Sequence, residues 1–402
     1  MYRVSPFIRH FAWALLAGTT CATLWVNLNP GSYYDAIEWR LIDVQMPGRF
    51  FGGHLGLTVM HLTSDLLMAL FMFFLGKELW EANVLERGSL RGRRAGAPLL
   101  ATLGGLAGAA LVWLILSALF ETAEEATDFG GWAVPLGSDV VLGYLVGRAV
   151  FDPGSPALHM LLLLTIGADL AGLMLLGFSF PDKPLRLLWL ILPLLASLGV
   201  WWTHGRMTHA GVTERQHRRA MHLWPYMLAG VASWIGVAAS GLPPALGLLP
   251  VIPAIPHADR AFGLFAEAEE YLTDPLNRFA HLSVKPLVGV LFLFGLTRGG
   301  IDLGAFAPTT GITLGALWLG KPLGVFLGGV VVAGALGLGL PTGLRRRDML
   351  LIAGISGMGF TVPLLALDTA LPGGAMAEAA RLGLAISLLA GPAMIFLARR
   401  LR

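Results

Sequence analysis

The segment LLLLTIGADLAGLMLLGF, residues 161–178, decides the fold class of this chain. It is long and apolar enough to cross a bilayer as one helix, and Asp169 is its only charged residue. A carboxylate near the middle of such a helix costs about 2.5–3.5 kcal/mol on insertion scales. It normally faces a protein interior or a water-filled cavity, where it handles ions or protons. Asp169 is therefore the first candidate functional residue.

The composition of the whole chain indicates a membrane protein. Of the 402 residues, 55% are hydrophobic and 13% are charged, whereas soluble domains carry about 25% charged residues. No segment has the layout of a cleavable signal peptide, so we expect the first apolar run to remain as a helix. The single cysteine, Cys21, excludes an internal disulfide and a cysteine-built metal site.

Twelve apolar segments predict an all-α polytopic membrane protein, a single transporter domain over residues 1–402. Core-type and interface-type helices are expected to interleave along the chain. The eighth segment is short and rich in proline, which makes it the weakest of the set. The predicted spans are residues 10–28, 55–77, 98–119, 132–150, 158–179, 185–202, 222–240, 243–256, 279–297, 311–338, 349–369 and 377–398.

The basic residues predict the orientation of the chain. They cluster after spans two, six, ten and twelve, within residues 87–94, 206–219, 345–347 and 399–402. Alternating spans place all four clusters on one side, and the acidic loop after span three falls on the other. By the positive-inside rule both termini are cytoplasmic in a bacterial inner membrane. The basic residues behind the net charge of +3 thus mark one membrane face and do not indicate a nucleic-acid site.

Two spans carry helix-breaking residues at their centres. Pro135 and Gly137 interrupt span four, and Gly357 and Gly359 interrupt span eleven. Interrupted helices in corresponding halves point to a transporter's central site, so we expect inverted repeats whose broken helices cross near the bilayer midplane. The alternative is that these glycines and prolines only allow tight packing.

Facing half-helix ends leave partial charges inside the membrane. Asp139, next to the first break, is placed to offset two positive N-termini. Lys321, in span ten, is placed to offset two negative C-termini.

Four motifs resemble the NhaA-type sodium/proton antiporter family over residues 11–398. They are Phe74-Leu-Gly-Lys-Glu78-Leu preceded by Asp65, Gly131-Trp-Ala-Val-Pro-Leu-Gly-Ser-Asp139, Gly320-Lys-Pro-Leu-Gly324 and Gly357-Met-Gly-Phe-Thr361. The resemblance implies secondary active antiport of sodium or lithium against protons, with no enzyme activity and no resident cofactor. It also implies that Asp169 and Asp139 hold the transported sodium, that Lys321 belongs to the same site, and that Glu78 and Asp65 contribute to a funnel or pH sensor.

The chain departs from the family in its fifth span. The family has two adjacent aspartates there, whereas this chain has Ala168 followed by Asp169. In the family the first aspartate pairs with the lysine that corresponds to Lys321. Lys321 then pairs with Asp169 or loses its proton, because a lone buried ammonium is costly. One-for-one exchange becomes plausible in either case.

A carboxylate that binds a proton or a cation, but not both, supports antiport if the site opens alternately to each side. Asp169 is our main candidate, and the alternative is a structural carboxylate paired with Lys321. Ser138 could lend its hydroxyl oxygen to the cation, although most membrane serines only bond to backbone carbonyls. Asp139 is either a neighbour of the cation or purely a helix stabiliser.

Other functions remain as alternatives at this point. One is a carrier on the same fold for potassium or an organic ion, and another is a sensor or interaction protein that transports nothing. No phosphate-binding loop indicates an ATP-driven pump. The expected partners are small inorganic cations and membrane lipid, without nucleic acid. The family's dimers use an outer hairpin, which residues 29–54 could supply as the contact of a homodimer.

Overall fold

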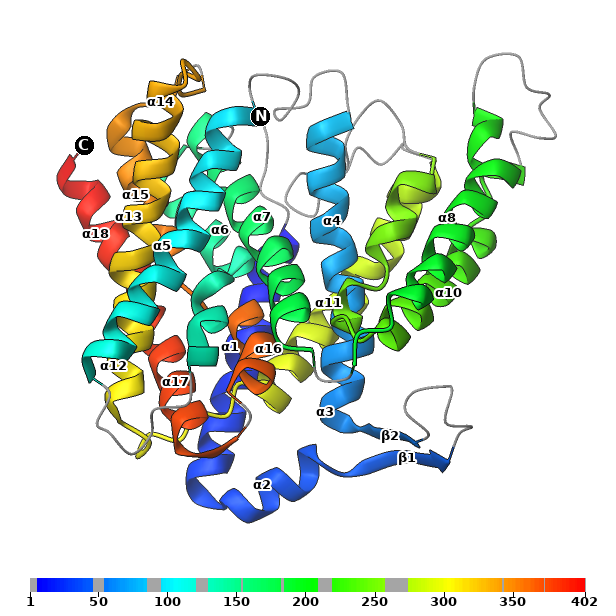
Figure 1. Cartoon of the computed structure of the whole chain (residues 1–402), viewed down its shortest axis with the longest axis horizontal. Helices are drawn as coiled ribbons and strands as arrows, with labels where there is room; N and C mark the ends of the chain where they lie inside the picture. The colour runs from blue at the N-terminus through cyan, green and yellow to red at the C-terminus, as the bar shows by residue number, and fades with distance from the viewer. Residues whose placement is uncertain are drawn as a thin grey trace.

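The computed structural model describes residues 6–45, 54–84, 95–120, 129–152, 155–181, 184–208, 219–256, 274–341, 343–371 and 373–401. These residues are mostly helical (Figure 1). In the first half the elements are α1 (Pro6–Leu28), α2 (Pro30–Ile37), β1 (Arg40–Gln45), β2 (His54–Thr58), α3 (Val59–His61), the π-helix η2 (Leu62–Leu67), α4 (Met68–Val84), α5 (Gly96–Phe120), the 3-10 helix η4 (Phe129–Leu136), α6 (Val140–Val150), α7 (Pro156–Ser179), η5 (Leu187–Leu190), α8 (Ile191–Thr203) and η6 (Gly205–Thr208).

In the second half the elements are α10 (Trp224–Ser240), η7 (Pro244–Leu246), η8 (Leu249–Ala254), α11 (Pro275–Arg298), α12 (Pro308–Gly315), η9 (Ala316–Gly320), α13 (Lys321–Phe326), η10 (Leu327–Val332), α14 (Ala333–Ala335), α15 (Arg346–Ser356), α16 (Thr361–Ala370), α17 (Gly374–Ser387) and α18 (Ala390–Leu401). The run from α12 to α14 is one span in which π-helical turns alternate with α-helical turns.

Each of the twelve predicted spans contains helix, and the chain is a polytopic all-α membrane protein as predicted. Among the described residues, seven helices are long and apolar enough to cross a membrane, and the α15–α16 pair, bent by 50° at its break, adds an eighth. Span eight differs most from the prediction. It forms only η7 and η8, because its prolines lack the amide hydrogens that a longer helix needs.

The chain ends lie on one face of the molecule. Figure 1 shows both termini and α14 at that face, which we call the termini face, and α2, β1 and β2 at the opposite face, which we call the hairpin face. Strands β1 and β2 pair antiparallel, with Ile42 opposite Leu57 and Val44 opposite Leu55. The structure thus has a hairpin, but its second strand, β2, lies almost entirely beyond the range of 29–54 suggested by the sequence, and an unpredicted helix, α2, occupies the start of that range.

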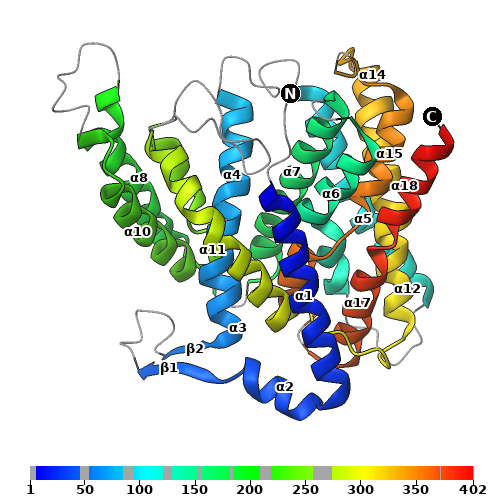
Figure 2. The same cartoon turned by 180° about the vertical axis from the view of Figure 1, so that it is seen from behind.

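Two sets of three spans run in opposite directions. Helix α5, the η4–α6 pair and α7 alternate in direction starting from the termini face, whereas α12–α14, the α15–α16 pair and α17–α18 alternate starting from the hairpin face (Figures 1 and 2). The middle member of each set is broken by a short non-helical segment, at residues 137–139 and 357–360. This arrangement agrees with the predicted inverted repeats.

Glycines bring α5 and α13 into backbone contact. A Cβ atom at Gly104 would overlap the carbonyl oxygen of Gly324, and one at Gly108 would overlap that of Gly320. Small residues spaced four apart let membrane helices approach this closely. Lys321, between these glycines, is thereby anchored at the centre of the crossing, where its Cγ atom lies 3.7 Å from the position of a Cβ at Gly105.

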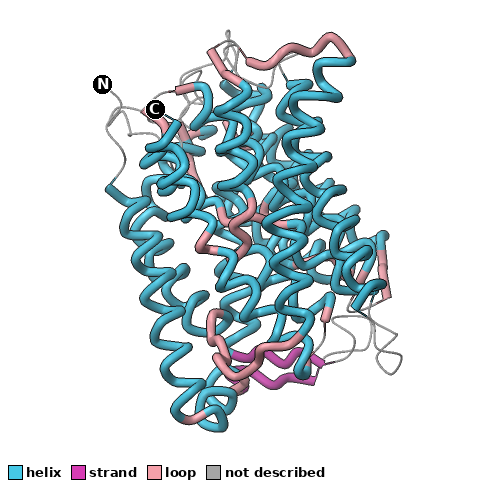
Figure 3. Tube along the Cα trace, turned by 90° about the vertical axis from the view of Figure 1, so that its left-hand side faces the viewer, coloured by secondary structure: helices cyan, strands magenta, loops and turns pink. Residues whose placement is uncertain are grey.

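The helices form two groups by their contacts. The first, which we call the core group, comprises α5, η4–α6, α7 and α12–α18. The second, the flanking group, comprises α1–α4, α8, α10, η7, η8 and α11, in which α1 packs along α11 and α8 along α10. Figure 3, a side view, shows most helices running between the face with the strands and the opposite face. The groups touch where α1 meets α6 and where α4 meets α7.

Candidate functional site

The two broken spans meet at their breaks. The amide of Asp139 donates to the carbonyl oxygen of Met358 over 2.9 Å, and the hydroxyl of Ser138 donates to that of Ser356 over 3.2 Å. Both acceptors lie at the carboxyl end of α15, so groups from the first break satisfy carbonyls that lack a helical partner. The breaks hold each other, which confirms the expected crossing of the two interrupted helices.

Asp139 serves the amino ends of two helices. Its Oδ1 accepts from the amide of Leu142 at 2.6 Å, which caps α6. Its Oδ2 accepts from the amide of Thr361 at 3.2 Å and from the Thr361 hydroxyl, at the start of α16. A carboxylate is favoured at the positive end of a helix, and this one faces two such ends. The predicted role as a partner of two N-termini fits this geometry.

Asp169 is the one carboxylate of the crossing whose acceptors are not all used. It lies in the middle of α7 and is 1% exposed. Its Oδ1 accepts from the amide of Ser138 at 2.6 Å, and its Oδ2 is buried with no hydrogen-bond partner among the described residues. A buried carboxylate oxygen without a donor is unfavourable unless a proton or a cation binds it. This geometry suits a site that is filled and emptied during a transport cycle.

Lys321 points at the carboxyl end of η4 from the α5–α13 contact. Its Nζ donates to the carbonyl oxygens of Pro135, at 3.3 Å, Leu136, at 2.9 Å, and Gly137. The side chain is fully buried, and three carbonyl acceptors match the three N–H donors of an ammonium group.

Of the two C-termini that the sequence assigned to Lys321, the side chain contacts one, the end of η4. Its hydrogen bonds all go to η4, while Ser138 and the Asp139 amide serve the end of α15. Nor does it pair with Asp169, because the described residues contain no ion pair between the two within 4.0 Å. Backbone carbonyls of Pro135, Leu136 and Gly137 are its hydrogen-bond partners instead.

Glycines at the breaks permit close packing. A Cβ at Gly137 would lie 2.6 Å from Cγ1 of Val362, and one at Gly357 would lie 2.6 Å from the carbonyl oxygen of Leu317. The amide of Gly359 donates to the hydroxyl oxygen of Ser387 at 3.1 Å, so span twelve holds the second break in place. These glycines therefore do allow tight packing, which was the alternative explanation for them. The breaks also provide the polar contacts described above.

Glu78 and Asp65 lie outside the crossing. Glu78 is half-buried in the second half of α4, and Asp65 is half-buried in the π-helix η2, towards the hairpin face. Beside Glu78, Lys77 and Glu81 form an ion pair of 2.7 Å and are 1% and 3% exposed. Glu81 was not predicted as a partner, although opposite charges four residues apart on a helix indicate such a pair.

Other partners were also missed from the sequence. Thr361 belongs to one of the four motifs and Ser387 lies outside them, and neither was assigned a role. Serine and threonine in membrane helices usually form hydrogen bonds within their own helix. Within the described part of the chain, no group of three or more His, Cys, Asp or Glu side chains could hold a metal ion.

Comparisons with known proteins agree with this geometry. Residues 9–397 match the family model of Na+/H+ antiporter 1. The chain is similar to the Na(+)/H(+) antiporter NhaA of Jannaschia sp. (strain CCS1), with 41% identity over 95% of this chain and 94% of the relative. It is also similar to the Na(+)/H(+) antiporter NhaA 2 of Pelobacter propionicus, with 35% identity over 98% and 97% of the two chains.

The fold is similar to that of the sodium proton antiporter MjNhaP1 from Methanocaldococcus jannaschii. That similarity has a TM-score of 0.51 at 16% identity and covers 98% of this chain and 96% of the other. The family match spans the helices that carry Asp139, Asp169 and Lys321. On the family model and these relatives, the chain belongs to the Na+/H+ antiporter 1 family.

Proposed function

We propose that this protein exchanges sodium, or lithium, for protons across the bacterial inner membrane by competition of the two ions for Asp169. The observation that carries the proposal is the buried Oδ2 of Asp169, which has no donor within the described residues. In one half-cycle a proton on this carboxyl supplies the missing partner. In the other half-cycle a sodium ion does so, and the two cannot bind together.

Asp139 and Ser138 support this site in different ways. Asp139 already accepts hydrogen bonds at both oxygens, so its main contribution is a fixed negative charge between two helix ends. The hydroxyl of Ser138 donates to Ser356, which leaves its own oxygen able to accept or to ligate a cation. The break itself, with Pro135 and Gly137, places both residues beside Asp169.

Counting charges at the crossing leads to one-for-one exchange. Lys321, with three carbonyl partners, keeps its proton throughout the cycle, and Asp139 keeps its charge as a double helix cap. Only Asp169 then changes its ligand, between one proton and one sodium ion. Because the occupied site carries the same charge in both half-cycles, the exchange is electroneutral. Ala168 removes the second carboxylate that a two-proton cycle would use.

The same proposal includes an orientation and partners. The start of α15 and the end of α18, which carry basic residues such as Arg346 and Arg399, lie at the termini face (Figure 1), and this supports placing both termini in the cytoplasm. The hairpin face then lies outside, where β1 and β2 are available as the contact of a homodimer within a lipid bilayer. Asp65 and Glu78 belong to the approaches to the site. Transport of this kind uses no resident cofactor and no covalent chemistry, so the protein is a carrier and not an enzyme.

No observation favours the rival functions. The family match and the relatives favour sodium and protons over potassium or an organic ion. The intact crossing, with Asp139, Asp169 and Lys321 all buried, argues against a scaffold that transports nothing.

Proton flux in everted vesicles tests the proposal. Vesicles from cells without other antiporters are acidified by respiration, and a pH-sensitive dye reports proton efflux after sodium, lithium or potassium is added. The wild type should respond to sodium and lithium, and Asp169→Asn should not. Absence of any cation-evoked flux in the wild type would exclude antiport, and equal flux in Asp169→Asn would exclude this site.

A further inference from the structure

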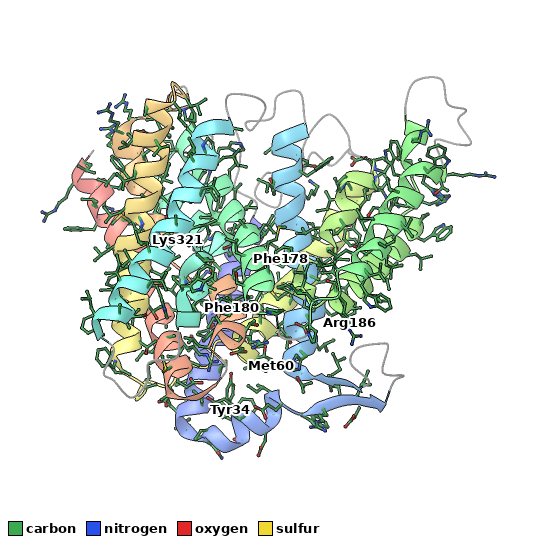
Figure 4. All side chains as sticks on the ribbon, viewed as in Figure 1. Tyr34, Met60, Phe178, Phe180, Arg186 and Lys321 are labelled. Carbon is green, nitrogen blue, oxygen red and sulfur yellow. The ribbon has the colours of Figure 1, made fainter. Side chains whose placement is uncertain are left out.

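A polar cavity of about 410 Å³ lies between the core group and the flanking group. Its walls include Leu173 and Phe180 of α7 and its C-terminal end, Leu365 of α16, and Met60 of α3. Figure 4 places Met60 and Phe180 nearer the hairpin face than Lys321. The cavity therefore lies on the hairpin side of the central crossing.

One wall of the cavity continues the face of α7 that carries Asp169. Residues three, four or seven positions apart lie on one face of a helix. Leu173, Leu176 and Phe180 follow Asp169 at intervals of four, seven and eleven residues, and all three line the cavity. The cavity thus reaches to about one helical turn from Asp169, where buried Leu173 closes it.

A second wall also leads down from the crossing. Thr361, which bonds to Asp139, begins α16, and Leu365 and Asp368 follow at intervals of four and seven residues. Both of these line the cavity. Two helices of the core group therefore present continuous faces from the ion site to this space.

Arg298, at the end of α11, joins the flanking group to the core group across the cavity. Its guanidinium forms an ion pair with Asp368 and donates to the hydroxyl of Ser64 at 2.7 Å. Arg298 is 8% exposed, so this ion pair lies largely out of contact with water, where breaking it costs more than at an exposed surface. The contact resists separation of the two groups at this face.

Asp368 also contacts a basic residue of its own group. Arg381, on α17, lies 3.5 Å from the other oxygen of Asp368 and 2.6 Å from Glu378. Glu378 also accepts from the hydroxyl of Tyr34, on α2, over 3.3 Å. This cluster therefore contacts the flanking group outside the cavity, because Tyr34, Glu378 and Arg381 do not line it. Arg381 therefore serves as a matched control for Arg298, with the same residue type and the same carboxylate partner.

The cavity is the entrance route by which alternating access would open Asp169 to the hairpin face, and we propose that the Arg298–Asp368 ion pair is the contact that keeps it closed. The proposal rests on the exchange described above. Alternating access requires Asp169 to be open to each face in turn. Opening towards the hairpin face separates α16 from the end of α11, which breaks this ion pair. Arg298 and Asp368 are thus positioning residues of the transport cycle.

Thiol labelling tests the entrance directly. Cys21 is the only cysteine, so a Cys21→Ala background carrying Leu173→Cys provides a single probe one turn from Asp169. A membrane-impermeant maleimide is added to right-side-out and to everted vesicles, and Ile42→Cys in β1 serves as the marker of the hairpin face. Arg298→Gln and Asp368→Asn should each speed labelling of Leu173→Cys about tenfold, which corresponds to about 1.4 kcal/mol. The increase should appear for reagent added on the side from which Ile42→Cys is labelled. Arg381→Gln should stay within about twofold of the background.

A covalent clamp provides the second measurement. Arg298→Cys with Asp368→Cys, in the Cys21→Ala background, is joined by a short bifunctional thiol reagent with a reducible bond. Cation-evoked flux should be lost on cross-linking and return on reduction. Full flux in the cross-linked protein would overturn the proposed role of the ion pair. Unchanged labelling in both single variants, or an equal rise in labelling with Arg381→Gln, would overturn it as well. Because labelling needs no transport, a labelling response without any wild-type flux would refute the exchange while leaving the entrance in place.

Discussion

Replacing Asp139 should destabilise the protein more than any other single change at the crossing. The carboxylate accepts from three buried donors, which are the amides of Leu142 and Thr361 and the hydroxyl of Thr361. In Asp139→Ala all three donors lose their acceptor, at about 1–2 kcal/mol each. Water entering so polar a site offsets part of this loss. We therefore expect a reduction of about 3 kcal/mol in the free energy of unfolding.

The isosteric variant separates the two helix caps. Asp139→Asn keeps one acceptor oxygen and so keeps one cap, and the loss of the other should cost about 1–2 kcal/mol. Thr361→Val removes one hydroxyl and no cap, and it should cost about 1 kcal/mol or less. Equilibrium unfolding of the purified variants in mixed detergent micelles measures these differences. A free energy of unfolding of Asp139→Ala within about 0.5 kcal/mol of the wild type, the usual range for surface substitutions, would contradict this role of Asp139. A larger loss of stability in Asp139→Asn than in Asp139→Ala would contradict it too.

Three further predictions follow from other parts of the fold. Gly324→Ala should lower the melting temperature in detergent, because its new methyl group would meet backbone atoms of α5. Gly311→Ala, with no atom within 4 Å of the new Cβ, should leave the melting temperature unchanged. Equal melting temperatures of the two variants would contradict the close helix contact. Ala168→Asp should supply Lys321 with a carboxylate and make exchange in liposomes depend on an imposed membrane potential, and a potential-independent rate in this variant would count against the charge count. Burial raises the pKa of Tyr33, in α2, from 10.0 to about 12. Between these two pH values the folded protein keeps a neutral phenol while the unfolded chain ionises. The stability of the folded protein should therefore fall as pH rises from about 10 to about 12. Tyr33→Phe should remove this part of the alkaline loss, which unfolding curves at several pH values would show.

The sequence predicted the architecture because the relevant signals are local. Apolar length identifies membrane helices, and proline and glycine beside polar residues identify the two breaks. The placement of Asp139 between two helix ends also followed, because few side chains can stabilise such ends inside a membrane. Span eight was overestimated, since apolar content alone does not show that its prolines limit it to 3-10 turns.

Long-range partners could not be predicted in the same way. The carbonyl cage of Lys321 depends on how closely α5 and α13 approach, which is set by glycines on two distant segments. The pairing of Arg298 with Asp368 joins residues 70 positions apart, and no local pattern in the sequence links the two. The free oxygen of Asp169 is a property of the assembled crossing, and no local pattern reports it.

Proton release on sodium binding tests the central claim most directly. Purified protein in weakly buffered detergent solution, near the pH at which Asp169 is half protonated, receives sodium chloride while a dye or an electrode records pH. The wild type should release protons up to one per bound sodium ion as sodium displaces them, and Asp169→Asn should release none. Sodium binding without proton release, or undiminished release from Asp169→Asn, would contradict the account.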